Sequence, residues 1–74
     1  MAYSIIHVRS GEALRVYTTL KGARIALTQF NQNAGWQSFV RYSDNGIEQM
    51  HGRMPYLQDF IYGLAPYGIK QYNA

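Results

Sequence analysis

The chain has 74 residues, no cysteine, and seven Lys and Arg against four Asp and Glu, which gives a formal net charge of +3. This length suits one small domain, so we expect residues 1–74 to form a single compact domain. The lack of Cys excludes disulfides, thiolate zinc sites and a thiol nucleophile. A hydrophobic content of 47% favours a folded chain over a disordered one.

Two alternating segments, Tyr3–Arg9 and Ala13–Thr18, predict an N-terminal β-hairpin. Both sides of the first segment are mixed, so the register must be chosen by cross-strand partners. A three-residue loop pairs Val8 with Leu14 and Ile6 with Val16 on a core face. The opposite face then carries Ile5, His7, Arg9, Arg15 and Tyr17.

The strongest local pattern predicts a helix that begins after Thr18 or Thr19 as N-cap and ends at Asn33-Ala34-Gly35. Its apolar positions recur at helical spacing and are Leu20, Ala23, Leu27, Phe30 and Ala34. The other side forms a polar stripe that we interpret as solvent-exposed, made of Lys21, Arg24, Thr28 and Asn31.

A second hairpin is predicted from strands over Trp36–Tyr42 and Ile47–His51 with Ser43–Gly46 between them. A four-residue loop pairs Arg41 with Glu48, whereas a two-residue Asn-Gly turn sets Arg41 opposite Met50. We prefer the first register because it joins opposite charges.

Pro55 fits the first position of a short second helix, whose apolar positions are Leu57, Phe60, Ile61 and Leu64. The segment Tyr67–Tyr72 could add a fifth strand at the sheet edge or remain unattached. The predicted fold is therefore α+β: an antiparallel sheet of two hairpins, a possible fifth edge strand, and two helices packed on one face. Its predicted core comprises Ile6, Val8, Leu14, Val16, Leu20, Leu27, Phe30, Phe39, Leu57, Phe60 and Ile61.

The sequence offers little support for chemistry. No glycines have nucleotide-binding spacing, and His7 and His51 lie on separate predicted strands without nearby ligands. The four acidic residues are dispersed over turns, a strand and a helix face, so no acid–base pair is indicated. We expect no enzyme activity, no metal and no cofactor.

The abundance of tyrosine points instead to binding, because Tyr is common at interfaces. The hairpin face of Ile5, His7, Arg9, Arg15 and Tyr17 is the candidate site unless the C-terminal segment covers it. We expect a protein partner or a second copy of the chain, most simply a homodimer. The alternative is RNA or single-stranded DNA, for which basic and aromatic side chains are suited.

The run Thr18-Thr19-Leu20-Lys21-Gly22-Ala23-Arg24-Ile25-Ala26-Leu27-Thr28-Gln29-Phe30-Asn31 resembles a segment in short accessory proteins of marine tailed phages. The resemblance implies a small phage-type protein that acts by binding a partner, and it transfers no functional residue. No apolar run approaches the roughly 18 residues of a membrane span, and the N-terminus lacks a signal-like apolar run. We therefore expect a cytoplasmic protein, in the host cytoplasm if it is phage-encoded.

Overall fold

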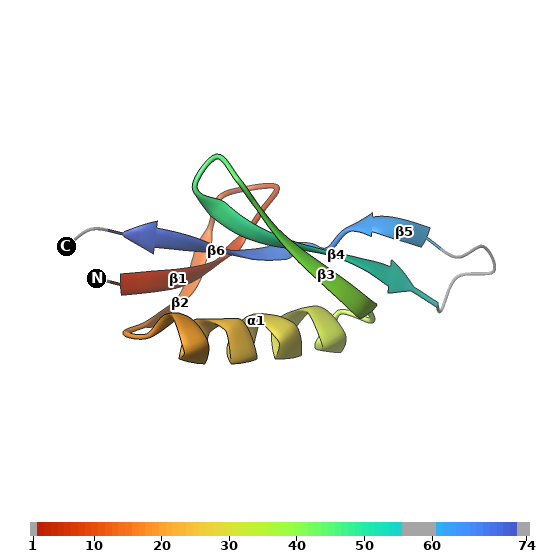
Figure 1. Cartoon of the computed structure of the whole chain (residues 1–74), viewed down its shortest axis with the longest axis horizontal. Helices are drawn as coiled ribbons and strands as arrows, with labels where there is room; N and C mark the ends of the chain where they lie inside the picture. Colours follow the sequence, from red (N-terminus) through yellow and green to blue (C-terminus); the bar gives the residue numbers. More distant parts are fainter. Residues whose placement is uncertain (1, 56–60, 73–74) are drawn as a thin grey trace.

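A computed structural model describes residues 2–55 and 61–72. One antiparallel sheet has the strand order β2-β1-β6-β4-β3, and β5 pairs with β4 beyond the end of β6. The strands are β1 (Ala2–His7), β2 (Ala13–Tyr17), β3 (Gln37–Asp44), β4 (Ile47–Met54), β5 (Ile61–Leu64) and β6 (Tyr67–Tyr72). The helix α1 (Leu20–Asn33) lies across one face of the sheet, and the β4 and β5 ends project as an arm (Figure 1).

The predicted helix is confirmed together with both of its ends. Thr19 is the N-cap, and its hydroxyl oxygen accepts a hydrogen bond from the Gly22 amide at 3.1 Å. Gly35, with φ of 95°, ends the segment in the left-handed conformation that glycine tolerates. The helix buries Ala23 and Leu27 against the sheet.

The prediction of two helices on the sheet is wrong, because Ile61–Leu64 forms strand β5 beside β4. Residues 56–60, with Leu57 and Phe60, lie outside the described residues. The spacing of apolar residues after Pro55 suits a helix, but a short apolar run also suits a strand when a partner is available. Here β4 supplies that partner in the register of Gly52 with Gly63.

The prediction for the C-terminal strand is also wrong, because β6 is central and not at an edge. It pairs with β1 over its whole length and with β4 at Lys70 and Ile69. The main core lies between α1 and the middle strands and contains Ile5, Ala23, Leu27, Trp36, Met50, Ala65 and Ile69.

The first hairpin has the opposite orientation to the one predicted. Ile5 is fully buried under α1 and Tyr17 packs against the same core, whereas Leu14 and Val16 are 41% and 64% exposed. Val16 pairs with Ser4 and not with Ile6. The longer turn pairs Ile6 with Ala13, and a register shift between Ile5 and Ile6 then sets Ser4 opposite Val16. The alternation cannot choose the buried side by itself. That choice follows from β6, whose Ile69 lies opposite Ile5.

The remaining predicted core positions divide between burial and partial exposure. Ile6 and Leu27 are buried, and Val8 is partly buried. The partly buried residues that pack against the main core include Leu20, Phe30 and Phe39.

The second hairpin adopts the register that we did not prefer. Asn45 and Gly46 have φ of 51° and 76°, which is the geometry of a two-residue hairpin turn. Arg41 therefore lies opposite Met50. The charge is accommodated because the guanidinium extends to α1, where it donates to the Thr28 hydroxyl at 3.1 Å.

Between β5 and β6 the pairing with β4 is interrupted, and α1 supplies the missing hydrogen bonds. The Ala65 amide still donates to Met50 at 2.8 Å, but the regular ladder resumes only at Ile69. In the gap, the fully buried side chain of Asn31 accepts from the Tyr67 amide at 3.1 Å and donates to the Tyr67 carbonyl at 3.3 Å. The expectation that Asn31 is solvent-exposed is therefore wrong.

Asn31→Ala should lower the free energy of unfolding by at least about 2 kcal/mol, because two backbone groups lose their partner and each costs about 1–3 kcal/mol. Denaturant unfolding followed by circular dichroism measures this loss. Asn33→Ala is the control, since Asn33 is exposed in the last turn of the same helix and should change stability by less than about 0.5 kcal/mol. Equal losses in the two variants would contradict the role of Asn31.

Gly68→Ala should destabilise the domain by about 1–3 kcal/mol through overpacking. A Cβ there would lie 2.9 Å from the Glu48 carbonyl oxygen and 3.1 Å from a Val8 methyl carbon, and the backbone oxygen cannot turn aside. Gly63→Ala is the matched control, because its Cβ would meet no atom of the described residues within 4 Å. Thermal unfolding should show a lower midpoint for Gly68→Ala alone, and unchanged midpoints for both variants would refute the close approach.

Candidate functional site

The sheet face turned away from α1 carries a cluster of aromatic and aliphatic side chains that we name the aromatic face. Met50 points toward α1, where its sulfur accepts from the Asn31 amide at 3.4 Å. Because side chains alternate along a strand, His51 points to the other side. Its cross-strand neighbours Val40 and Leu64 share that side. The aromatic face is made of Val40, Tyr42, His51, Tyr62 and Leu64.

Three rings form a row across β3, β4 and β5. The Tyr42 and His51 ring centroids are 4.6 Å apart at 72°, and those of His51 and Tyr62 are 6.1 Å apart at 84°. Both contacts are edge-to-face, which is a favoured arrangement for aromatic pairs. The Tyr42 hydroxyl donates to the Gln49 side chain at 2.8 Å, so this ring is also fixed at its polar end.

The row is open to solvent at its β5 end. Tyr62 is 60% exposed, and the aliphatic neighbours Val40 and Leu64 are 58% and 41% exposed. A small domain normally buries large apolar side chains, so several exposed together on one face indicate a contact surface.

Cationic side chains flank the aromatic face at two ends. Arg53 is the cross-strand partner of Tyr62. At the other end, Arg9 and Leu64 line a pocket of about 410 Å³ with His7, Val8, Ala65 and Pro66. Of the described acidic residues, Glu12 follows the first turn and Glu48 faces α1, whereas Asp44 lies on the same side of β3 as Tyr42, next to the second turn. Among the described residues, Arg9 and Arg53 therefore border the two ends of the aromatic face, and Asp44 lies beyond Tyr42.

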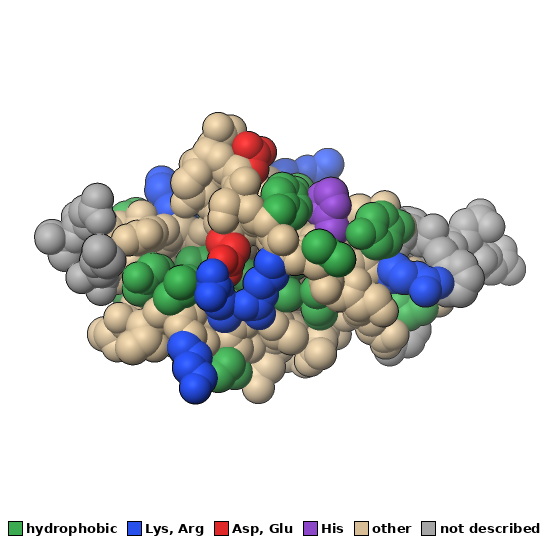
Figure 2. Space-filling model, in the orientation of Figure 1, with side chains coloured by type: hydrophobic (Ala, Val, Ile, Leu, Met, Phe, Trp, Pro, Cys, Tyr) green, Lys and Arg blue, Asp and Glu red, His purple; other side chains and the backbone are tan. Residues whose placement is uncertain are grey.

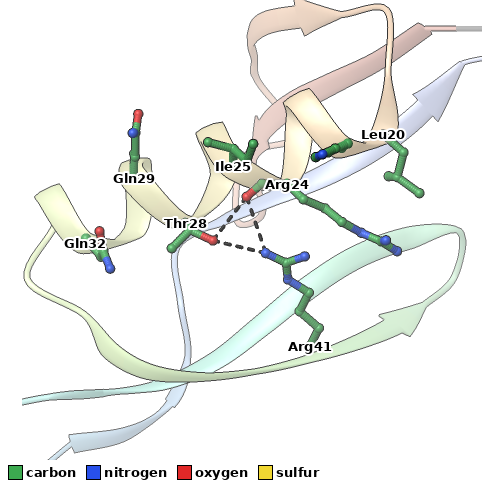
Figure 3. Close-up of a pocket in the computed structure, with 8 residues that line it drawn as sticks. Leu20, Arg24, Ile25, Thr28, Gln29, Gln32 and Arg41 are labelled. Carbon is green, nitrogen blue, oxygen red and sulfur yellow. Dashed lines mark hydrogen bonds between the residues drawn. The ribbon is translucent and has the colours of Figure 1, made fainter.

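A second hollow, of about 540 Å³, runs between α1 and β3 (Figure 3). Its cationic lining consists of Lys21, Arg24 and Arg41. Arg24 makes a bidentate pair with Glu48, with an Nη2 to Oε1 distance of 2.7 Å, and the hydrogen bond to this carboxylate raises the pKa of Arg24 above its ordinary value. Arg41 donates to Thr28 and to the Arg24 carbonyl, at 3.1 and 3.4 Å.

Both arginines thus connect the second hairpin to α1, and Figure 2 shows charged side chains of both signs gathered at the middle of the molecule. These hydrogen bonds give the two guanidinium groups a structural role, because they hold the second hairpin to α1. Among the described residues, the side chains of Val40, Tyr62 and Leu64 have no hydrogen bond or ion pair that links two elements in this way. The aromatic face is therefore the stronger candidate for binding.

The structure divides the five site residues predicted from the sequence. Ile5 is fully buried and Tyr17 is half-buried, because α1 covers their side of the hairpin. Arg15 is exposed beside α1. His7 lies edge-on to Tyr67 with ring centroids 5.6 Å apart, and its buried Nδ1 has no hydrogen-bond partner among the described residues.

Arg9 is exposed in the first turn, and both Arg9 and His7 line the pocket that includes Leu64 of the aromatic face. The five side chains therefore do not form one open surface. Sequence reasoning missed Tyr42, His51 and Tyr62 as a group, since Tyr62 was assigned to a helix. The alternation of Val40 with Tyr42 was the available signal for two of these positions on one strand face.

Within residues 2–55 and 61–72, no three His, Asp or Glu side chains come together as a metal site would require. No helix in that part of the chain has the length and apolar character needed to cross a bilayer. Comparisons of the chain with protein-family models, with curated proteins and with solved structures give no significant match. The resemblance of residues 18–31 to phage proteins stays a prediction.

Proposed function

We propose that this protein is a non-enzymatic binding module that holds single-stranded nucleic acid on its aromatic face. The observation that carries the proposal is the row of Tyr42, His51 and Tyr62 on the sheet face opposite the helix. A sheet covered by a helix on one side presents its other side as a flat platform, and unpaired bases stack on aromatic rings at such platforms.

Tyr62 is the main stacking residue in this proposal, because it is the most exposed ring of the row. Tyr42 and His51 are partly buried, and their edge-to-face contacts keep the row ordered before a ligand arrives. Preorganised rings lose little conformational entropy on binding. Val40 and Leu64 extend the apolar surface on both sides of His51.

The charges favour a polyanionic strand over a neutral partner. Arg9 and Arg53 lie at separate ends of the aromatic face and are placed to contact phosphates on either side of the stacked bases. The formal net charge of +3 adds a long-range attraction. No base-specific hydrogen-bond pattern is evident among the described side chains of the face, so the binding would tolerate many sequences.

A protein partner is the competing occupant, since exposed Val40, Tyr62 and Leu64 would also suit an apolar interface. The salt dependence of binding distinguishes a nucleic-acid partner from a protein partner. Binding to phosphates weakens steeply as salt concentration rises, whereas an apolar protein contact changes little.

Tyr62→Ala should weaken binding of a fluorescein-labelled oligothymidylate or oligouridylate by roughly 5- to 150-fold, because stacking on one ring contributes about 1–3 kcal/mol. Fluorescence anisotropy at low salt measures the change. Tyr72→Ala is the matched control, because Tyr72 is 39% exposed but belongs to the far end of β6, opposite Ala2. No affinity of the native chain for either oligonucleotide would overturn the proposal.

Arg9→Gln should weaken binding at every oligonucleotide sequence and reduce the slope of log affinity against log salt by about one unit, as loss of one phosphate contact does. The same anisotropy titrations over several salt concentrations give this slope. Lys21→Gln is the charge-matched control, because Lys21 is exposed on α1 at the other side of the sheet. An identical slope for Arg9→Gln and the native chain would place Arg9 outside the binding surface.

A further inference from the structure

Strand β2 lies at one edge of the sheet, so its outward backbone N–H and C=O groups can pair with another strand. It pairs with β1 on one side, and no described strand lies on its other side. Four of its five residues are exposed, among them Leu14 and Val16 at 41% and 64%. An extended edge strand with exposed apolar side chains is a ready template for pairing with another strand.

The opposite edge, β3, differs from β2 in its backbone: both strands have a register shift near their first residues, but among the described residues of the two strands a left-handed non-glycine residue occurs in β3. Ser38 has a left-handed φ of 58°, and the register of β3 with β4 shifts between Gln37 and Val40. Such irregularities discourage the addition of another strand. In β2 the register shift lies at its start, opposite Ile5 and Ile6, and Arg15 is its charged residue.

We propose that β2 pairs with β2 of a second copy of this chain, antiparallel about a twofold axis at Val16, to form one continuous sheet. A second copy satisfies the requirement for a partner strand that has the same open edge and apolar side chains on the same face. This inference is independent of nucleic-acid binding, because it rests on the edge at β2 and not on the aromatic face.

Charge selects the register. A pairing centred on Arg15 would place two guanidinium groups opposite each other, and like charges in that position are destabilising. A pairing centred on Val16 instead places Arg15 opposite Tyr17 of the partner subunit, where a cation can contact an aromatic ring. Arg15 and Tyr17 share the helix side of β2 and line one hollow with Phe30 and Asn33, so there is room for this contact.

The absence of native cysteine makes the register directly testable by single cysteine substitutions. In the proposed dimer, the two copies of Val16→Cys would have Cα atoms about 4.5–5.5 Å apart, within the range that a disulfide spans. The two copies of Arg15→Cys would be roughly 8 Å apart, which is too far. Mild oxidation should therefore give a covalent dimer of V16C on a non-reducing gel and leave R15C monomeric.

Val40→Cys is the control for random collision, because Val40 is 58% exposed on the other edge strand. Linkage of V16C no faster than V40C, or linkage of R15C in its place, would overturn the proposed register. Circular dichroism of each reduced variant verifies that it is folded, as expected for exposed positions.

Sedimentation equilibrium of the unmodified chain tests the dimer without any cross-link. The native chain should show a concentration-dependent monomer–dimer equilibrium, and Val16→Lys should weaken it at least tenfold, since a charge on an edge opposes pairing. Val40→Lys should leave the equilibrium unchanged. A monomer mass for the native chain from micromolar to millimolar concentration would overturn the proposal.

Discussion

The hydrogen bonds between Asn31 and the Tyr67 backbone are the constraint on which the arrangement of this domain depends. At this point the chain leaves its pairing with β4 alone and becomes the central strand between β4 and β1. The Pro66 carbonyl accepts a hydrogen bond from the Val8 amide at 2.9 Å, so the backbone just before Tyr67 already bonds to the residue that follows β1. Tyr67 would then present its amide and carbonyl to a gap in the ladder. Asn31 fills that gap from the helix, so helix docking and strand order are set together.

The change from β5 to β6 as the neighbour of β4 also makes the two ends of the sheet different on the face away from the helix. Toward the two hairpin turns, Gly68 allows the Val8 and Ile47 methyl carbons to approach closely, and Ile6 opposite it is buried. That end has an apolar layer of its own. Toward the β4 and β5 arm, no described element covers the sheet, and the rings of His51 and Tyr62 remain accessible in part. The aromatic face is therefore a consequence of the pairing of β5 with the part of β4 that extends beyond β6.

The features that could be predicted from the sequence are those decided locally. The helix of Leu20–Asn33 follows from one apolar stripe, and its N-cap at Thr19 and its glycine stop need only neighbouring residues. The strand at Ile61–Leu64 and the central place of β6 depend on partners far along the chain, which periodicity does not report. The prediction of which side of the first hairpin is buried was wrong for the same reason. Ile5 and Ile6 are equally apolar, and only the position of Ile69 on β6 decides which of them faces the helix. For the site, Arg9 belongs both to the set predicted from the sequence and to the residues that border the proposed aromatic face. The row of rings was not predicted, because it joins three strands of which one was expected to be helical.

The two proposals have a geometric relation that neither requires by itself. Val16 shares a sheet side with Ser4, Lys70 and Ile47 through successive cross-strand pairs, and alternation along β4 places His51 on that side as well. A twofold axis perpendicular to a sheet preserves its sides. Pairing of two β2 strands would therefore present both aromatic faces on the same side of one extended sheet, with each face at an outer end. One flexible polyanion that reached both faces would bind the second at a raised effective concentration, so modest stacking at each site would yield a larger combined affinity. In that arrangement the distance between the two aromatic faces would set the length of single-stranded nucleic acid that the dimer can bind.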